Sequence, residues 1–214
     1  IYEDLGNATL ADLNTKRCRV IAPDFRPCAK YGNVFSTLHR LLSSAEDAKK
    51  VRTEENGGDK LVQISSSELS ALKRKCASAT FEDFDLSTWL VDSCTAMGMI
   101  RPTPVQLRCI PPLLRGRNCV ACAQTGSGKT ATFAIPILQR LSEDPYGIFS
   151  VVITPARELA MQIADQFRAL GAPMRVRVAV VIGGLSLLAQ SLEVQRRPHV
   201  IVATPGRLAS LIDS

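Results

Sequence analysis

The 214-residue sequence lacks any run of about 18 uncharged apolar residues, which is the length that a membrane-spanning helix needs. Its first residues, Ile1-Tyr2-Glu3-Asp4, lack the basic and apolar blocks of a secretory signal. Neither sign of charge dominates, because the sequence has 26 Lys and Arg and 20 Asp and Glu. The net charge of +6 permits an anionic partner without demonstrating one. With 46% hydrophobic residues, the composition excludes a disordered chain and a collagen. We therefore expect a globular intracellular protein with no membrane partner.

Metal-binding and disulfide patterns are also lacking. His39 and His199 stand alone, so neither is assigned any chemistry. The seven cysteines are an odd, scattered set, which is typical of reduced thiols inside cells. Cys119 and Cys122 have the spacing of a zinc pair, but a strand would point them to opposite faces and no second pair follows. We interpret them as core thiols.

Residues 1–80 read as a largely irregular, partly disordered N-terminal extension, because they show no sustained hydrophobic period. Residues 43–60 are polar and charged and contain the pair Gly57-Gly58 near their end, which predicts a linker. Short helices are expected over residues 31–42 and after the capping-box pattern at residues 65–68. The basic run at residues 73–75 favours a solvated helix end over a nuclear address or a nucleic-acid contact.

Residues 81–214 alternate apolar, β-branched runs with helical stretches. The predicted strands cover residues 118–122, 150–154, 177–182 and 199–203, and the predicted helices cover residues 129–141, 157–170, 187–196 and 206–212. Strands that are apolar on both faces and alternate with helices indicate a parallel sheet covered on both sides. The predicted fold class is therefore α/β, with a parallel sheet and helices on both faces.

A glycine-rich segment joins the first predicted strand to its helix: Ala123-Gln124-Thr125-Gly126-Ser127-Gly128-Lys129-Thr130. Glycines let the backbone curl so that several N–H groups converge on phosphate oxygens at a helix N-terminus. Lys129, the single lysine of residues 81–214, would reach the outer phosphates, and the Thr130 hydroxyl would ligate Mg²⁺. A plain glycine turn and a dinucleotide fold, with Glu143 as its acid, are the alternatives. The dinucleotide fold leaves the Lys-Thr pair without a purpose.

The segments around this loop resemble, in order, the motifs of the DEAD-box RNA helicases. They are a Q motif at residues 98–106 with Phe81 placed 17 residues before Gly98, a motif Ia at residues 154–160, a double glycine at residues 183–184, and a motif Ib at residues 204–207. The resemblance covers residues 81–214. It implies a first RecA-like lobe of a P-loop NTPase that uses ATP and Mg²⁺ and binds RNA without reading its sequence.

The resemblance also implies a role for each matching residue. Gln106 carries the donor and acceptor that adenine N6 and N7 require, Phe81 would stack on the base, and Arg101 would complete the nucleotide site. Lys129 and Thr130 are the implied catalytic residues. RNA phosphates would be held by Pro155, Ala156, Arg157, Gly183, Gly184, Thr204, Pro205, Gly206 and Arg207.

Plainer interpretations exist for single residues. Gln106 alone reads as a helix-surface glutamine, Phe81 and Phe84 as core, and Arg157 or Arg207 as surface charges. Ala156 stands where the family usually has Thr, so one hydroxyl contact to RNA is missing, and Met99 replaces the usual aromatic.

No Asp-Glu-Ala-Asp follows motif Ib, although family members continue into that strand and a second lobe. The lobe is thus expected to be truncated before this strand, and two functions stay open. One is an ATP-dependent RNA helicase lobe, and the other is a catalytically inactive truncated product that binds nucleotide or RNA weakly. Residues 142–149 resemble most closely the nucleolar members that act in small-subunit ribosome biogenesis. That likeness implies rRNA processing in the nucleolus and pre-ribosomal protein partners.

Overall fold

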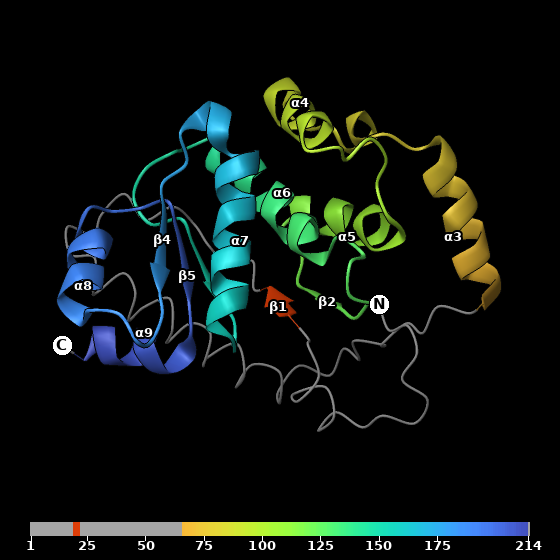
Figure 1. Cartoon of the computed structure of the whole chain (residues 1–214). Helices are drawn as coiled ribbons and strands as arrows, with labels where there is room; N and C mark the ends of the chain where they lie inside the picture. Colours follow the sequence, from red (N-terminus) through yellow and green to blue (C-terminus); the bar gives the residue numbers. More distant parts are fainter. Residues whose placement is uncertain (1–18, 22–65, 214) are drawn as a thin grey trace, which may run out of the picture. The chain divides into compact units, whose positions relative to one another are not determined.

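The computed structural model describes residues 19–21 and 66–213, which divide into two compact units, residues 19–21 with 66–140 and residues 141–213 (Figure 1). The helix and linker predicted for residues 31–42 and 43–60 lie outside the described residues. None of the described helices has the length and apolar character that a bilayer crossing requires.

The first unit is mainly helical. It contains β1 (Arg19–Ile21), α3 (Ser66–Ser78), the 3₁₀ helix η1 (Phe81–Phe84), α4 (Thr88–Ala96), α5 (Pro104–Leu114), β2 (Cys119–Ala121) and α6 (Lys129–Leu141), whose last residue belongs to the second unit. The helix expected after the capping-box pattern is confirmed as α3, with Glu68 in its first turn. Buried apolar side chains of α5 pack against the residues of β2, so the helix is fixed beside this strand.

The second unit is an open α/β sheet. Along the chain it contains β3 (Ser150–Ile153), α7 (Arg157–Leu170), the 3₁₀ helix η2 (Ala172–Met174), β4 (Val178–Val181), α8 (Leu187–Gln195), β5 (Val200–Ala203) and α9 (Pro205–Ile212). The strands are parallel in the order β3-β5-β4, with Ile153, Ala203 and Val181 at the same level. All four residues of β5 are buried, as expected for a central strand.

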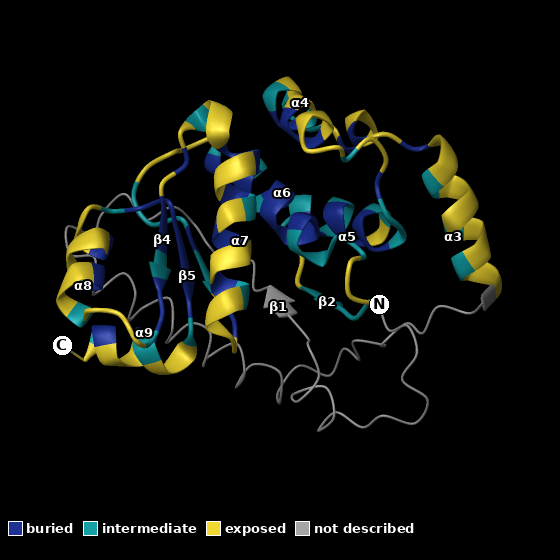
Figure 2. Cartoon of the chain, in the orientation of Figure 1, coloured by how far each residue is buried: buried dark blue, intermediate teal, exposed yellow. Residues whose placement is uncertain are grey.

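Helices cover both faces of this sheet. Ile201 and Ala203 of β5 share a core cluster with Leu208 and Leu211 of α9 and with Val194 of α8. The alternate residues of β5 therefore face the other side, and α7, which also packs on β4 and β5, covers it. Figure 2 shows the outer surfaces of α7 and α8 exposed and the strands between them buried.

The predicted parallel sheet with helices on both faces is confirmed for three of its four strands. The first predicted strand, residues 118–122, forms as β2 but pairs with β1 in an antiparallel register that places Val20 opposite Val120. Within the described residues β2 has no parallel partner. An unpaired strand edge bonds to any extended segment that lies alongside it, and the three residues of β1 take that place.

Candidate functional site

The predicted phosphate loop connects β2 to α6. Gly126 and Gly128 adopt positive φ angles of 85° and 82°, a conformation that residues with a Cβ rarely adopt. Between them, the Ser127 N–H donates to the Gln124 carbonyl at 3.3 Å and closes a tight turn. The Lys129 ammonium donates to the carbonyls of Ala123 and Gln124, so the lysine side chain curls back over the loop. Thr130 stands in the first turn of α6.

Helix α5 is tied to this loop by two side chains. The Thr103 hydroxyl donates to the Ser127 carbonyl at 2.8 Å, and Gln106 Nε2 donates to the Gly128 carbonyl at 3.3 Å. Gln106 is 2% exposed, and its Oε1 accepts the Thr103 N–H at 2.9 Å, as glutamine does in a capping box. The Thr103-x-x-Gln106 spacing was a sequence signal for this cap. Two donors and two lone pairs on the amide leave one of each for a further partner.

Gly128 is required by space as well as by its φ angle. A Cβ at Gly128 would lie 2.5 Å from Gln106 Nε2 and 3.5 Å from Thr103 Oγ1. A Cβ at Gly126 would meet nothing within 4 Å, although its φ angle is similar. Side chains of α5 therefore pack against the loop at Gly128, whereas there is free space beside Gly126.

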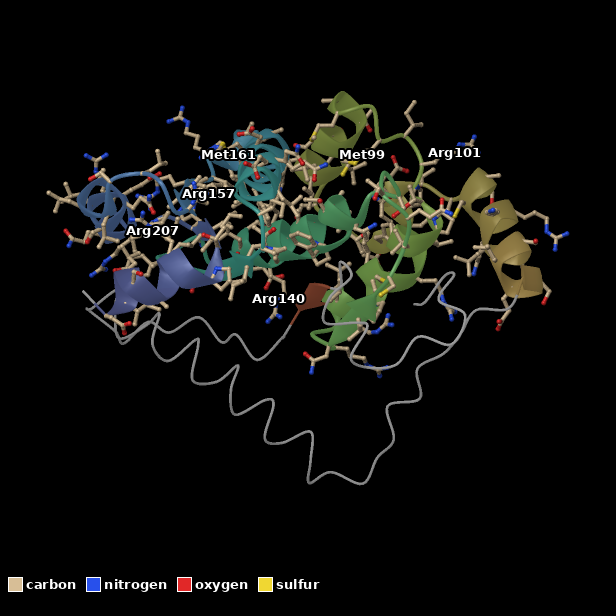
Figure 3. All side chains as sticks on the ribbon, turned by 60° about the horizontal axis from the view of Figure 1, so that its bottom comes forward. Met99, Arg101, Arg140, Arg157, Met161 and Arg207 are labelled. Carbon is tan, nitrogen blue, oxygen red and sulfur yellow. The ribbon has the colours of Figure 1, made fainter. Side chains whose placement is uncertain are left out.

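The other residues proposed for the nucleotide lie in different settings. Phe81 is 2% exposed, and its ring packs edge-on against Phe84, with 5.9 Å between the ring centroids. The Thr80 N–H donates to the Asp83 carboxylate at 2.8 Å and so begins the 3₁₀ turn that carries Phe81. Arg101 is exposed in the segment that precedes α5 (Figure 3). The structure thus places Phe81 in the core, and base stacking by this ring stays a prediction.

The residues proposed for RNA all follow the carboxyl ends of parallel strands in the second unit. Thr154 to Arg157 follow β3, Gly183 and Gly184 follow β4, and Thr204 to Arg207 follow β5. Backbone bonds from Thr154 N–H to the Ala203 carbonyl and from Thr204 N–H to the Val181 carbonyl, each 2.9 Å, continue the sheet by one residue. All three segments therefore leave the sheet at one edge, where open parallel sheets bind ligands.

Arg157 lies against the double glycine. Its guanidinium nitrogens are 3.1 Å and 2.7 Å from the points that a Cβ of Gly183 and of Gly184 would occupy. Gly184 also has a φ angle of 88°. Arg157 extends from the first turn of α7, and the half-buried Arg207 extends from the first turn of α9 (Figure 3). The structure thus brings Arg157 and the two glycines together, and their binding of RNA stays a prediction.

Gln190 positions the double glycine and was not found from the sequence. It is 4% exposed on α8, and its amide donates to the Ile182 carbonyl at 2.9 Å and accepts the Ile182 N–H at 3.1 Å. Ile182 directly precedes Gly183, so both backbone groups before the turn are fixed by one side chain. No sequence spacing marks such a contact.

The chemistry that this arrangement offers is anion binding at two places. The phosphate loop combines positive-φ glycines, a lysine and the N-terminus of α6, which together suit a phosphate chain. The sheet edge of the second unit offers two arginines and the N-termini of α7 and α9, which suit separate phosphates. Among residues 19–21 and 66–213, no three His, Cys, Asp or Glu side chains gather as metal ligands.

Comparison with known proteins agrees with this geometry. The family described as DEAD/DEAH box helicase matches residues 103–214. These residues include Thr103 and Gln106, the phosphate loop and all three segments at the sheet edge. The chain belongs to the DEAD/DEAH box helicase family.

Similar proteins carry helicase names. The chain is 58% identical over 136 residues to the human (Homo sapiens) protein named Probable ATP-dependent RNA helicase DDX49, over 64% of this chain and 28% of that protein. It is 56% identical over 136 residues to ATP-dependent RNA helicase DBP8 of Saccharomyces cerevisiae, over 64% of this chain and 32% of that protein. The chain thus spans about a third or less of the length of these curated relatives.

Two solved structures share the fold. A DEAD box protein from the hyperthermophile Methanococcus jannaschii matches with a TM-score of 0.58 and 33% identity, over 63% of this chain and 37% of that one. A hypothetical ATP-dependent RNA helicase from Sulfolobus tokodaii matches with a TM-score of 0.54 and 42% identity, over 60% of this chain and 37% of that one. The RecA-like fold class predicted from the sequence is confirmed.

Proposed function

We propose that this chain is the ATP-binding and RNA-binding first lobe of an ATP-dependent RNA helicase. The observation that carries the proposal is the pair of hydrogen bonds that Thr103 and Gln106 donate to carbonyls of the phosphate loop. This contact supports the proposal because it sets a side-chain amide, which carries the donor and acceptor that adenine requires, beside the loop that suits phosphates. The helicase names of the relatives support the same assignment.

The division of roles follows from the chemistry of the side chains. Lys129 neutralises phosphate charge, and the N–H groups of the loop and of α6 orient the phosphate oxygens. Mg²⁺, bound by the nucleotide and the Thr130 hydroxyl, would neutralise charge that develops on the phosphates. Since Thr130 offers one hydroxyl and the 214 residues hold no Asp-Glu-Ala-Asp, we infer that this polypeptide alone does not hydrolyse ATP.

Adenine recognition is tested by nucleotide binding. Calorimetric titration of the chain with ATP and GTP should show a preference for ATP that Gln106→Ala removes. Thr103→Val is the matched control, because it deletes the tie to Ser127 and leaves the Gln106 amide in place. It should weaken both nucleotides alike. An unchanged ATP preference in Gln106→Ala would refute the adenine assignment.

RNA binding is inferred for the sheet edge of the second unit. Because phosphates carry no sequence information, Arg207→Ala should weaken poly-U and mixed RNA by similar factors, and affinity should fall as salt rises. A loss confined to one sequence would indicate base contacts instead. The likeness of residues 142–149 to nucleolar members supports pre-ribosomal RNA as the substrate, with pre-ribosomal proteins as partners. Crosslinking in cells that recovers no ribosomal RNA precursor would overturn this assignment.

A further inference from the structure

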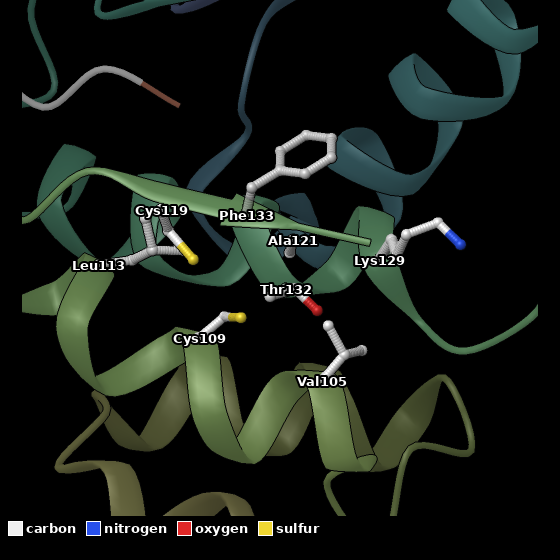
Figure 4. A pocket seen from close by; sticks show the side chains of 8 residues that line it. All are labelled: Val105, Cys109, Leu113, Cys119, Ala121, Lys129, Thr132 and Phe133. Carbon is white, nitrogen blue, oxygen red and sulfur yellow. The ribbon is translucent and has the colours of Figure 1, made fainter. Parts of the chain in front are cut away.

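Two cysteine side chains meet behind the phosphate loop. Cys109 of α5 is 1% exposed, and the half-buried Cys119 of β2 packs against the apolar cluster that contains it. Figure 4 shows both sulfur atoms directed into the space between α5 and β2. They line a cavity of about 20 Å³, which is otherwise mostly apolar and has room for about one water molecule.

The two thiols differ in acidity. A hydrogen bond from Cys109 lowers the pKa of Cys119 to about 7, although burial opposes this shift. The same bond, together with burial, raises the pKa of Cys109. Cys119 is therefore the thiolate of the pair near neutral pH, and Cys109 keeps its proton. Cys94 of α4 contrasts with them, because burial raises its pKa to about 11.

We propose that Cys109 and Cys119 are an oxidation-sensitive dithiol whose disulfide clamps α5 onto β2. The proposed oxidant is a hydroperoxide. The Cys119 sulfur attacks a peroxide oxygen, the O–O bond breaks, and a sulfenic acid and hydroxide form. The Cys109 sulfur then attacks the Cys119 sulfur, the S–O bond breaks, and the hydroxide leaves as water with the proton of Cys109. The thiols lose two electrons and two protons, and hydrogen peroxide is reduced to two waters.

The clamp would act on the neighbouring loop. A disulfide holds its sulfurs about 2.05 Å apart, much closer than a hydrogen bond does, so α5 must shift relative to β2. Thr103 and Gln106 at the start of α5 hold the loop carbonyls of Ser127 and Gly128, and β2 leads into the same loop. The shift misaligns these two hydrogen bonds and so displaces the phosphate loop. The oxidised chain therefore binds ATP more weakly. This consequence rests on the proposed function, whereas the disulfide itself does not.

The disulfide is tested by peptide mapping of the full chain. After treatment with one equivalent of hydrogen peroxide, tryptic peptides 109–115 and 118–129 should appear linked, with the mass of two hydrogens lost, and dithiothreitol should separate them. Fragmentation of peptide 118–129 distinguishes Cys119 from Cys122. The link should persist in Cys122→Ala and vanish in Cys119→Ala and Cys109→Ala. A link through Cys122, or oxidised Cys119 beside an alkylatable Cys109, would overturn the proposal, and the wild-type map decides this even if a variant fails to fold.

A second measurement tests the clamp. The affinity for a fluorescent ATP analogue should fall about two- to twelvefold on oxidation, the equivalent of one ordinary hydrogen bond, and recover with dithiothreitol. A linked chain with unchanged affinity would refute the clamp. A reduced chain that binds no ATP would refute the proposed function, while the peptide map would still decide whether the dithiol forms.

Discussion

Because Gly128 contacts Gln106, replacing Gly128 by alanine should destabilise the chain more than the same replacement at Gly126, in the same loop. Gly126→Ala should cost about 1–2 kcal/mol of unfolding free energy, because it places a Cβ at a φ angle of 85° in open space. Gly128→Ala carries the same backbone strain at 82°, and its Cβ would also lie 2.5 Å from Gln106 Nε2. The amide must move and lose its bond to the Gly128 carbonyl, at an added cost of about 0.5–1.5 kcal/mol.

The assay is urea denaturation followed by the fluorescence of Trp89, the one tryptophan of the sequence, which lies on α4 in the same unit as the loop. A double-mutant cycle isolates the contact. In a Gln106→Ala background the extra cost of Gly128→Ala should disappear, while the cost of Gly126→Ala should not change. Equal costs for the two glycines in the wild-type background, or an extra cost that survives Gln106→Ala, would show that the amide does not lie where the structure places it.

Three further outcomes are expected. Burial, and to a lesser extent the charge of Arg177, lowers the pKa of His199 in the folded chain below its ordinary value of 6.5. The unfolded chain therefore binds the proton more readily, and the unfolding free energy should fall as the pH drops below 6.5. Urea denaturation at several pH values should show a smaller fall for His199→Asn. Gln190→Leu should lower the unfolding free energy by about 1–3 kcal/mol for each backbone group of Ile182 left unbonded, and Gln195→Leu on the exposed face of α8 should be near neutral. The 214-residue chain should show no steady-state ATPase with RNA and Mg²⁺, and turnover that Lys129→Ala abolishes would contradict this.

The local elements were predictable because their determinants are local. Positive φ angles at Gly126 and Gly128 follow from the need for a curled backbone between a strand and a helix. The strands of the second unit were predictable because β-branched runs that are apolar on both faces form only in a covered sheet. The resemblance assigned Arg157 and the double glycine to the same RNA site, but their direct contact could not be predicted, since Gly183 lies 26 positions after Arg157.

Contacts between side chains distant in sequence could not be predicted. The meeting of Cys109 and Cys119 depends on the turn between α5 and β2, and their spacing gives no sign of it. The Cys119-x-x-Cys122 spacing, which does not indicate a metal pair, says nothing about the approach of Cys119 to Cys109. The antiparallel pairing of β2 depends on where residues of the extension happen to lie. Phe81 and Phe84 are only three residues apart, and their packing agrees with the plainer interpretation of both rings as core, while base stacking by Phe81 stays a prediction.

One four-residue pattern explains why two arginines reach the same sheet edge. Thr-Pro-x-Arg occurs at residues 154–157 after β3 and at residues 204–207 after β5. In both, the Thr N–H makes the last bond to the neighbouring strand, and the following Pro has no N–H with which to continue it. The chain must therefore leave the sheet at this residue, and in the second copy the proline, Pro205, is the first residue of α9, where its fixed φ angle suits a helix. Each arginine then falls in the first turn of a helix whose N-terminus attracts anions. Since β3 and β5 are parallel neighbours, the repeated pattern sets the two arginines after adjacent strand ends, at one edge of the sheet.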